Sequence, residues 1–294
     1  MTELVQTIVL GLLIGGVYAL AASGLTLIFG IMNVINVAHG AFLILASYLT
    51  FIVWTHTGLD PMLFAIALTP VMFAVGWLSY RLLIARIAGS PPSMSVLLTF
   101  AIALVIEGIL SIVYKGIFRA VTPSYFDESF HLGNIFFPKA QVYAALIALG
   151  FLALLLVFLT RTWMGRAIRA SSQNSQGALL MGVNIGAVAA LTFAIGIATT
   201  GAAGAMLSVL YPFYPAAHYR WISRLLGIIV LGGMGSLAGA FAGALLLGVA
   251  ETMTQTYVST RWATVVPYVL ILVVLLLRPQ GLFGMRVRED VAAA

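Results

Sequence analysis

No charged residue occurs between Glu3 and Asp60. A membrane-spanning helix needs about 20 mostly apolar residues, and an element of a soluble core needs no such length. Inside lipid every backbone N–H and C=O must be satisfied within the segment itself, which a helix achieves. The run from Leu4 to Leu59 is long enough for two crossings and predicts an integral membrane protein.

The composition of the whole chain agrees with that prediction. Hydrophobic residues make up 62% and charged residues 7% of it, against roughly 25% charged residues in an ordinary soluble domain. With 294 residues there is room for roughly eight to ten crossings and little else. We expect an all-α polytopic membrane protein whose single transmembrane domain covers residues 1–294.

The cysteine and histidine content and the net charge argue against a metal-binding or nucleic-acid-binding protein. The chain has no cysteine, and its four histidines show no ligand spacing, so no metal site is expected. The net charge of +6 comes from basic residues in short loops. These indicate topology in the membrane rather than nucleic-acid binding.

Charged residues, glycines and prolines divide the chain into about eight apolar segments. The predicted helices are residues 4–30, 38–54, 61–80, 93–114, 140–160, 186–211, 225–250 and 262–277. The longest loop is 115–139, and residues 212–224 are expected to form an aromatic loop at the membrane interface.

Arginines in short loops predict which side each loop faces. Arg81 and Arg86 are separated from the basic loop 161–185 by two predicted crossings. Both loops can therefore lie in the cytoplasm, where Lys and Arg collect. The acidic loop 115–139 and the N-terminus are then expected outside.

The glycine-rich segment 225–250 leaves two topologies. As one crossing, it would put the tail with Arg286 and Arg288 outside, against the charge rule. As two shorter helices, near 225–234 and 237–250, it enters and leaves on one side and returns the tail to the cytoplasm. We favour the broken, re-entrant version, because many glycines weaken a continuous helix.

Two segments carry similar interruptions. Residues 30–45 and 232–247 each have a Gly-x-Met break followed by Gly-Ala-Phe and an apolar run. Such pairs are typical of inverted-repeat transporters, in which broken helices face a cavity. Small residues that only permit tight helix packing explain the likeness equally well. Gly233 and Gly235 are candidates for the translocation path.

Polar groups inside the predicted helices are further candidates for that path. Asn33, Asn36 and His39 would share one face if their stretch is helical, where they either line the path or join helices by hydrogen bonds. Glu107 is well inside a crossing, which favours a function, with a protonated, hydrogen-bonded carboxyl as the alternative. Glu251 is expected to be a solvated carboxylate at the end of a crossing.

The loop 161–185 contains a short predicted helix. Asn174 or Ser175 suits its N-cap, the helix runs through Met181, and Gly182 suits a left-handed C-terminal cap. An apolar helix tip outside the membrane fits a groove on a partner protein. An amphipathic helix resting on the bilayer surface fits as well.

Three stretches together resemble the LIV-type permeases, which are membrane subunits of bacterial ATP-binding-cassette importers for branched-chain amino acids, and the length is LivH-like. The stretches are GLTLIFGIMNVINVAHGAFLILASY (24–48), MGRAIRASSQNSQGALLMGVNI (164–185) and VLGGMGSLAGAFAGALLLG (230–248). The resemblance covers nearly the whole chain. Sister families that handle urea, short amides and other small organic acids share these stretches, so the substrate stays open.

The resemblance implies a role for the cytoplasmic loop and for several partners. The loop would dock on an ATPase through Arg166, Arg169, Gln173, Asn174, Gly177, Ala178, Leu179, Leu180, Met181, Gly182 and Asn184. A periplasmic binding protein would deliver the solute, and two permease subunits, this chain with itself or with a paralogue, would form the path. Two cytoplasmic ATPases would drive alternating access, and this chain would lie in the bacterial inner membrane.

ATP chemistry is expected in those partners. The sequence has no G-x-x-x-x-G-K-[ST] motif, so we expect neither a nucleotide cofactor nor enzyme activity in this chain. A stand-alone secondary transporter or channel is the main alternative, but it would need more intramembrane acids than Glu107. An intramembrane enzyme would need an HExxH, paired Asp or Ser/His signature, which the predicted crossings lack.

Overall fold

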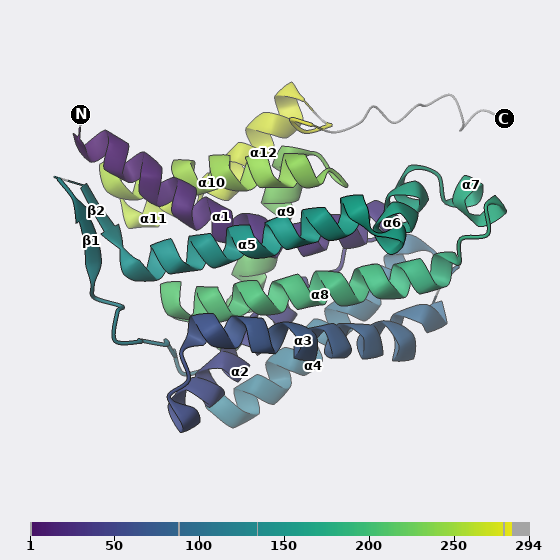
Figure 1. The fold of residues 1–294 in the computed structure, drawn as a ribbon, viewed down its shortest axis with the longest axis horizontal. Helices are drawn as coiled ribbons and strands as arrows, with labels where there is room; N and C mark the ends of the chain where they lie inside the picture. The colour runs from purple at the N-terminus through teal and green to yellow at the C-terminus, as the bar shows by residue number, and fades with distance from the viewer. Residues whose placement is uncertain (1, 88, 134, 279, 284–294) are drawn as a thin grey trace.

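The computed structural model describes residues 2–87, 89–133, 135–278 and 280–283 (Figure 1). Arg286 and Arg288, on which part of the topology prediction depends, lie outside the described residues. The described chain is a bundle of helices with one small β-hairpin at one end (Figure 1). The expected all-α polytopic membrane fold is confirmed.

Seven helices in the described part of the chain are long and apolar enough to cross a membrane. They are α1 (Thr2–Met32), α2 (His39–Thr57), α3 (Pro61–Leu82, extended by the 3-10 turn η1, Ile84–Ile87), α4 (Pro92–Tyr114), α5 (Lys139–Arg161), α8 (Ile185–Leu210) and α10 (Leu237–Tyr257). Asp60 caps α3 by accepting a hydrogen bond from the Met62 N–H at 2.8 Å.

The remaining elements are short. They are the antiparallel strands β1 (Ser129–Leu132) and β2 (Ile135–Pro138), α6 (Trp163–Gln173), α7 (Ser175–Leu180), the 3-10 turn η2 (Pro215–Ala217), α9 (His218–Gly232), α11 (Thr260–Ala263) and α12 (Val266–Leu277). The hairpin belongs to the loop 115–139, where sequence reasoning expected no strand.

Helices α1 and α8 form the centre of the bundle. In each, 67% of the apolar stretch is buried, against 22% in α4, so α4 lies at the perimeter. A Cβ on Gly24 of α1 would collide with the backbone of Gly196 in α8. These small residues let the two backbones approach closely, which is how helices associate in lipid.

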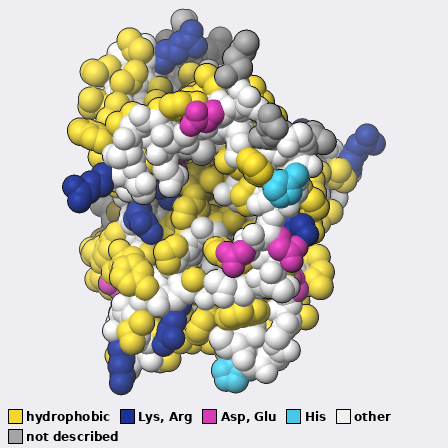
Figure 2. Space-filling view, turned by 90° about the vertical axis from the view of Figure 1, so that its left-hand side faces the viewer, with side chains coloured by type: hydrophobic (Ala, Val, Ile, Leu, Met, Phe, Trp, Pro, Cys, Tyr) yellow, Lys and Arg dark blue, Asp and Glu magenta, His cyan; other side chains and the backbone are white. Residues whose placement is uncertain are grey.

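The two ends of the bundle differ. The start of α1 and the β-hairpin lie at one end, and α6 and α7 lie at the other together with the end of α3 (Figure 1). Figure 2 views the first end, where acidic and basic side chains are scattered among hydrophobic side chains and backbone. Below we call it the N-terminal end, and we call the other the α7 end.

Two of the predicted helix boundaries are wrong. The predicted crossing 262–277 is divided into α11 and α12, because Ser259 caps α11 and Pro267 lies in the first turn of α12. With 12 residues, α12 rises about 18 Å and is shorter than a full crossing. The loop predicted over 212–224 is also wrong in its second half, because α9 begins at His218.

The glycine-rich segment is interrupted at residues 233–236, between α9 and α10. Both helices extend beyond the two pieces predicted from the sequence, α9 toward its N-terminus and α10 to Tyr257. Gly232 and Gly239 pack backbone to backbone, so the two helices form a tight hairpin. Whether this hairpin is re-entrant in the membrane stays a prediction.

Candidate functional site

The helical structure is interrupted between α1 and α2, and the chain turns back into the bundle there. Residues 33–38 are not helical, so Asn33, Asn36 and His39 do not share a helix face as the sequence prediction supposed. Asn33 is exposed and adopts a positive φ of 51°. His39 begins α2 while its Nε2 atom lies 3.0 Å from the carbonyl oxygen of Ala21, well inside α1.

His39 and Asn36 are both buried, but their polar atoms differ in what they contact. His39 Nε2 also lies 2.7 Å from the Thr200 hydroxyl of α8. The side-chain amide of Asn36 is 1% exposed, and neither its nitrogen nor its oxygen has a hydrogen-bond partner among the described residues. A buried amide without partners costs free energy, which singles out Asn36 in this break.

Helix α9 also begins inside the bundle, against the start of α2. A Cβ on Gly40 would lie 2.5 Å from the carbonyl oxygen of His218. His218 Nε2 lies 2.9 Å from a carboxylate oxygen of Glu107 on α4. The His218 side chain is 1% exposed and that of Glu107 is 20% exposed. The pair therefore extends from the interior of the bundle to its perimeter.

The second break, at 233–236, lies beside the end of α1. Gly233 and Gly235 both have positive φ, at 100° and 85°, a backbone that glycine adopts without strain. Gly235 contacts Gly30 of α1, and Ser236 caps α10 through the Gly239 N–H at 3.1 Å. This break therefore lies at the α7 end, whereas the starts of α2 and α9 lie deeper.

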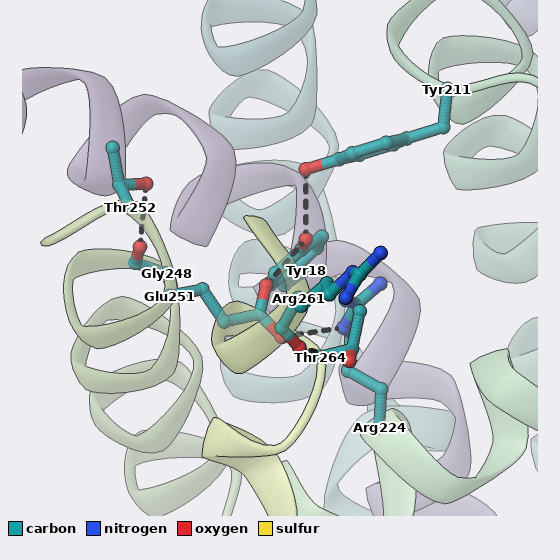
Figure 3. Close-up of polar contacts among 8 residues, drawn as sticks. All are labelled: Tyr18, Tyr211, Arg224, Gly248, Glu251, Thr252, Arg261 and Thr264. Atoms are coloured by element: carbon teal, nitrogen blue, oxygen red, sulfur yellow. Dashed lines mark hydrogen bonds and ion pairs between the residues drawn. The ribbon is translucent and has the colours of Figure 1, made fainter. Parts of the chain in front are cut away.

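A second polar cluster joins α1, α9 and α10 (Figure 3). Arg224 Nε donates to Glu251 Oε1 at 2.8 Å, and the Tyr18 hydroxyl donates to Glu251 Oε2 at 2.9 Å. The Tyr211 hydroxyl lies 2.9 Å from that of Tyr18. The Arg224 guanidinium also lies 4.9 Å from the ring centroid of Trp221.

This cluster corrects the prediction for Glu251. Its carboxylate is buried and ion-paired rather than solvated, because α10 continues to Tyr257 and leaves Glu251 inside the helix. Sequence reasoning also missed Arg224, which it placed in an interfacial loop. The apolar residues on both sides of Arg224 were a signal that the helix had already begun.

The loop 161–185 consists of two capped helices at the α7 end. Thr162 caps α6 through the Gly165 N–H at 3.0 Å, and Asn174 caps α7 through the Gly177 N–H at 2.8 Å. Of the two N-caps offered by the sequence, Asn174 is the observed one. Asn184 caps α8 through the Ala187 N–H at 3.0 Å.

The end of α7 is closed by two backbone hydrogen bonds. The Gly182 N–H donates to the Leu179 carbonyl at 2.9 Å and the Val183 N–H to the Ala178 carbonyl at 3.0 Å, which is the Schellman arrangement. Gly182 has the expected left-handed φ, 82°, but α7 ends at Leu180 rather than Met181.

The tip of α7 presents apolar side chains to the outside. Leu180 is 87% and Met181 85% exposed, whereas Ala178 is buried against the rest of the chain. The other exposed residues of the predicted docking set are Arg166, Arg169, Gln173, Asn174, Leu179, Gly182 and Asn184. The structure thus gathers the predicted set on α6, α7 and the turn that leads from α7 into α8.

The chain matches one protein family over residues 7–275, described as "Branched-chain amino acid transport system / permease component". The chain belongs to this permease family. It is a multi-pass inner-membrane transport component. Among the described residues, no group of three His, Asp or Glu side chains could hold a metal ion.

Named relatives agree with the family. The LivH permease protein of Salmonella typhimurium, described as part of a high-affinity branched-chain amino acid transport system, is 31% identical over 93% of both chains. BraD of Pseudomonas aeruginosa, described in the same words, is 30% identical over 95% of both chains. A probable LivH of Methanocaldococcus jannaschii is 27% identical over 90% of this chain and 88% of its own. No solved structure matches the chain.

Proposed function

We propose that this permease is the membrane subunit of an ATP-driven importer for branched-chain amino acids. Its family and the descriptions of its relatives support the substrate class. An importer for urea, short amides or other small organic acids is the alternative within the same architecture. The single observation that carries the proposal of a separate motor is the exposed apolar tip of α7, fixed by caps at both of its ends.

The α7 tip fits a groove on a cytoplasmic ATPase. An exposed Leu180 and Met181 would otherwise face water, and a helix with apolar anchors binds such grooves. Two ATPases bind and hydrolyse the ATP, because this sequence has no P-loop motif of its own. A periplasmic binding protein delivers the solute, and a second permease subunit, a paralogue or another copy of this chain, completes the path.

The broken helices suit alternating access. The starts of α2 and α9 leave backbone groups and polar side chains inside the bundle, where irregular backbone is tolerated only against protein or a wet cavity. Asn36, His39 and Glu107 lie around these starts, and Gly233 and Gly235 form the hinge between α9 and α10. We place the translocation path along Asn36, Glu107 and these two glycines, and we assign His39 to joining α1, α2 and α8.

The test separates docking from folding. In the reconstituted complex, Met181→Asp puts a charge into the contact, and Gly182→Val forces a β-branched residue into φ 82°. Both variants should insert normally and lose most ATPase pull-down, or hydrolyse ATP without uptake. Val258→Asp is a matched control, because Val258 is an exposed apolar residue outside the α7 tip, 66% exposed.

Two outcomes would contradict the proposal. If both α7 variants assemble and transport as wild type does, α7 rests on the bilayer surface instead. If this chain alone, in vesicles without an ATPase, accumulates leucine, it is a secondary transporter. If Val258→Asp also loses ATPase pull-down and uptake completely, the assay reports folding rather than docking.

A further inference from the structure

The cluster around Glu251 has an excess of positive charge. Arg224 pairs with Glu251, and Arg220 lies one turn before Arg224 on the same face of α9. Figure 3 shows Arg261 pointing from α11 toward the same cluster. Arginines therefore outnumber the one carboxylate in this part of the molecule, and Arg220 and Arg261 are exposed in the single subunit.

The cluster also has more hydrogen-bond donors than acceptors. Each oxygen of Glu251 already accepts one bond, from Arg224 and from Tyr18. Arg224 uses only its Nε–H, and its two terminal nitrogens make no hydrogen bond to the described residues. An arginine has five N–H donors and no acceptor, so four donors of a guanidinium whose side chain is only 10% exposed remain for an acceptor from outside.

The rings beside Arg224 hold this unused edge in place. The guanidinium carbon lies 5.1 Å from the ring centroid of Tyr18 and 4.9 Å from that of Trp221. The two rings meet edge to face with centroids 5.9 Å apart. A guanidinium fixed in this way is preorganised for a planar, bidentate acceptor, because little side-chain entropy remains to be lost.

We propose that Arg224, Arg220 and Arg261 form a carboxylate-binding site in the half of the permease nearer its N-terminal end, where the carboxylate of the transported amino acid is received. Carboxylate geometry matches the outer edge of a guanidinium, and such charge-assisted pairs are among the stronger hydrogen bonds. The substrate identity rests on the proposed function, whereas the arginine site itself does not.

The binding test uses the purified full chain in phosphatidylcholine nanodiscs with radiolabelled L-leucine. Unlabelled 4-methylpentanoate, which has the carboxylate but no amino group, should compete. L-leucinamide, which lacks the carboxylate, should compete at least about tenfold more weakly, the loss expected for one charge-assisted pair. Equal competition by leucinamide, or by inorganic phosphate at the same concentration, would overturn the site.

The variants avoid the buried pair, because removing Arg224 would strand the Glu251 carboxylate. Arg220→Gln and Arg261→Gln should each weaken leucine binding about tenfold at an unchanged melting temperature. Arg86→Gln, at an exposed arginine in η1, outside this cluster, should bind as wild type does. Wild-type binding by both test variants would refute the proposal.

Two further arms identify the source of the anion and separate this inference from the proposed function. Replacing phosphatidylcholine by phosphatidylglycerol should leave leucine binding unchanged; if binding is lost, a lipid headgroup occupies the arginines and the site is not for solute. If 4-methylpentanoate binds in an arginine-dependent way and leucine does not, the carboxylate site stands and the amino-acid assignment falls. If the complex imports leucine equally well with either arginine variant, the assignment stands and the site falls.

Discussion

His39 and His218 occupy matching places in two regions of the bundle. Each follows an alanine and begins a helix inside the bundle, after a break that follows a long central helix, α1 in one case and α8 in the other. Their partners differ. Within the described part of the chain, the hydrogen-bond partners of His39 are neutral, the Ala21 carbonyl and the Thr200 hydroxyl, whereas His218 contacts the carboxylate of Glu107.

This difference indicates different roles for the two helix starts. His39 is 0% exposed and its Nε2 atom links α2 to both α1 and α8, which suits a role in holding helices together. Around His218 an intramembrane acid is partly exposed at the perimeter, and such groups mark solute or ion pathways. We therefore expect stability to depend more on His39, and transport more on the Glu107 pair.

The largest effect is expected where the two regions touch. Gly40→Ala adds a Cβ 2.5 Å from the His218 carbonyl oxygen and 3.0 Å from the Ile222 nitrogen. Because backbone must move, we expect about 3 kcal/mol of lost stability or more, seen as little monodisperse protein and a lower melting temperature. Gly16→Ala is the control, since nothing lies within 4 Å of its Cβ. Equal melting of both variants would mean that the two helix starts are not in contact.

The second prediction concerns the region around His39 alone. His39→Ala removes a fully buried ring and the partner of Ala21 and Thr200, so we expect a loss of about 2–4 kcal/mol. Uptake per folded molecule in the reconstituted complex should remain near wild type. A variant that melts normally but transports poorly would reverse the assignment of the two histidines.

The sequence predicted most helices and the capped helix α7, because both depend on local patterns. Apolar length gives a crossing, and Asn174 with Gly182 gives the ends of α7. It did not predict that α9 begins at His218. Aromatic and basic residues before Arg224 are typical of a membrane interface, and nothing local shows that His218 and Trp221 among them are buried.

The buried pair of Arg224 and Glu251 could not be predicted for a related reason. The two residues are on different helices, and each is costly inside a membrane unless the other is present. Sequence patterns describe one segment at a time, whereas this pairing exists only after α9 and α10 fold against each other. The partnerless amide of Asn36 likewise becomes visible only once the break before α2 is seen to be buried.

A smaller effect on stability, with a large one on transport, is expected from Glu107→Gln. The glutamine keeps a hydrogen-bond acceptor for His218 Nε2, and the side chain is partly exposed, so we expect less than about 1 kcal/mol of destabilisation. Uptake should fall about tenfold if the charge contributes to the path. Glu128→Gln is the control, an exposed acid at the N-terminal end that pairs with Lys139. Normal uptake by Glu107→Gln would leave helix packing as its role.

The smallest effect on the protein is expected from labels that determine which side each end faces. Wild type has no cysteine, so Ser124→Cys, Gln176→Cys and Arg278→Cys each add one exposed thiol and should transport normally. An impermeant maleimide should label Ser124→Cys in intact cells, and the other two only after the inner membrane is opened. Labelling of Gln176→Cys in intact cells would place α7 outside, where no ATPase could reach it. Labelling of Arg278→Cys would instead make the glycine-rich segment a single crossing, and the matching depths of His39 and His218 would then need another explanation.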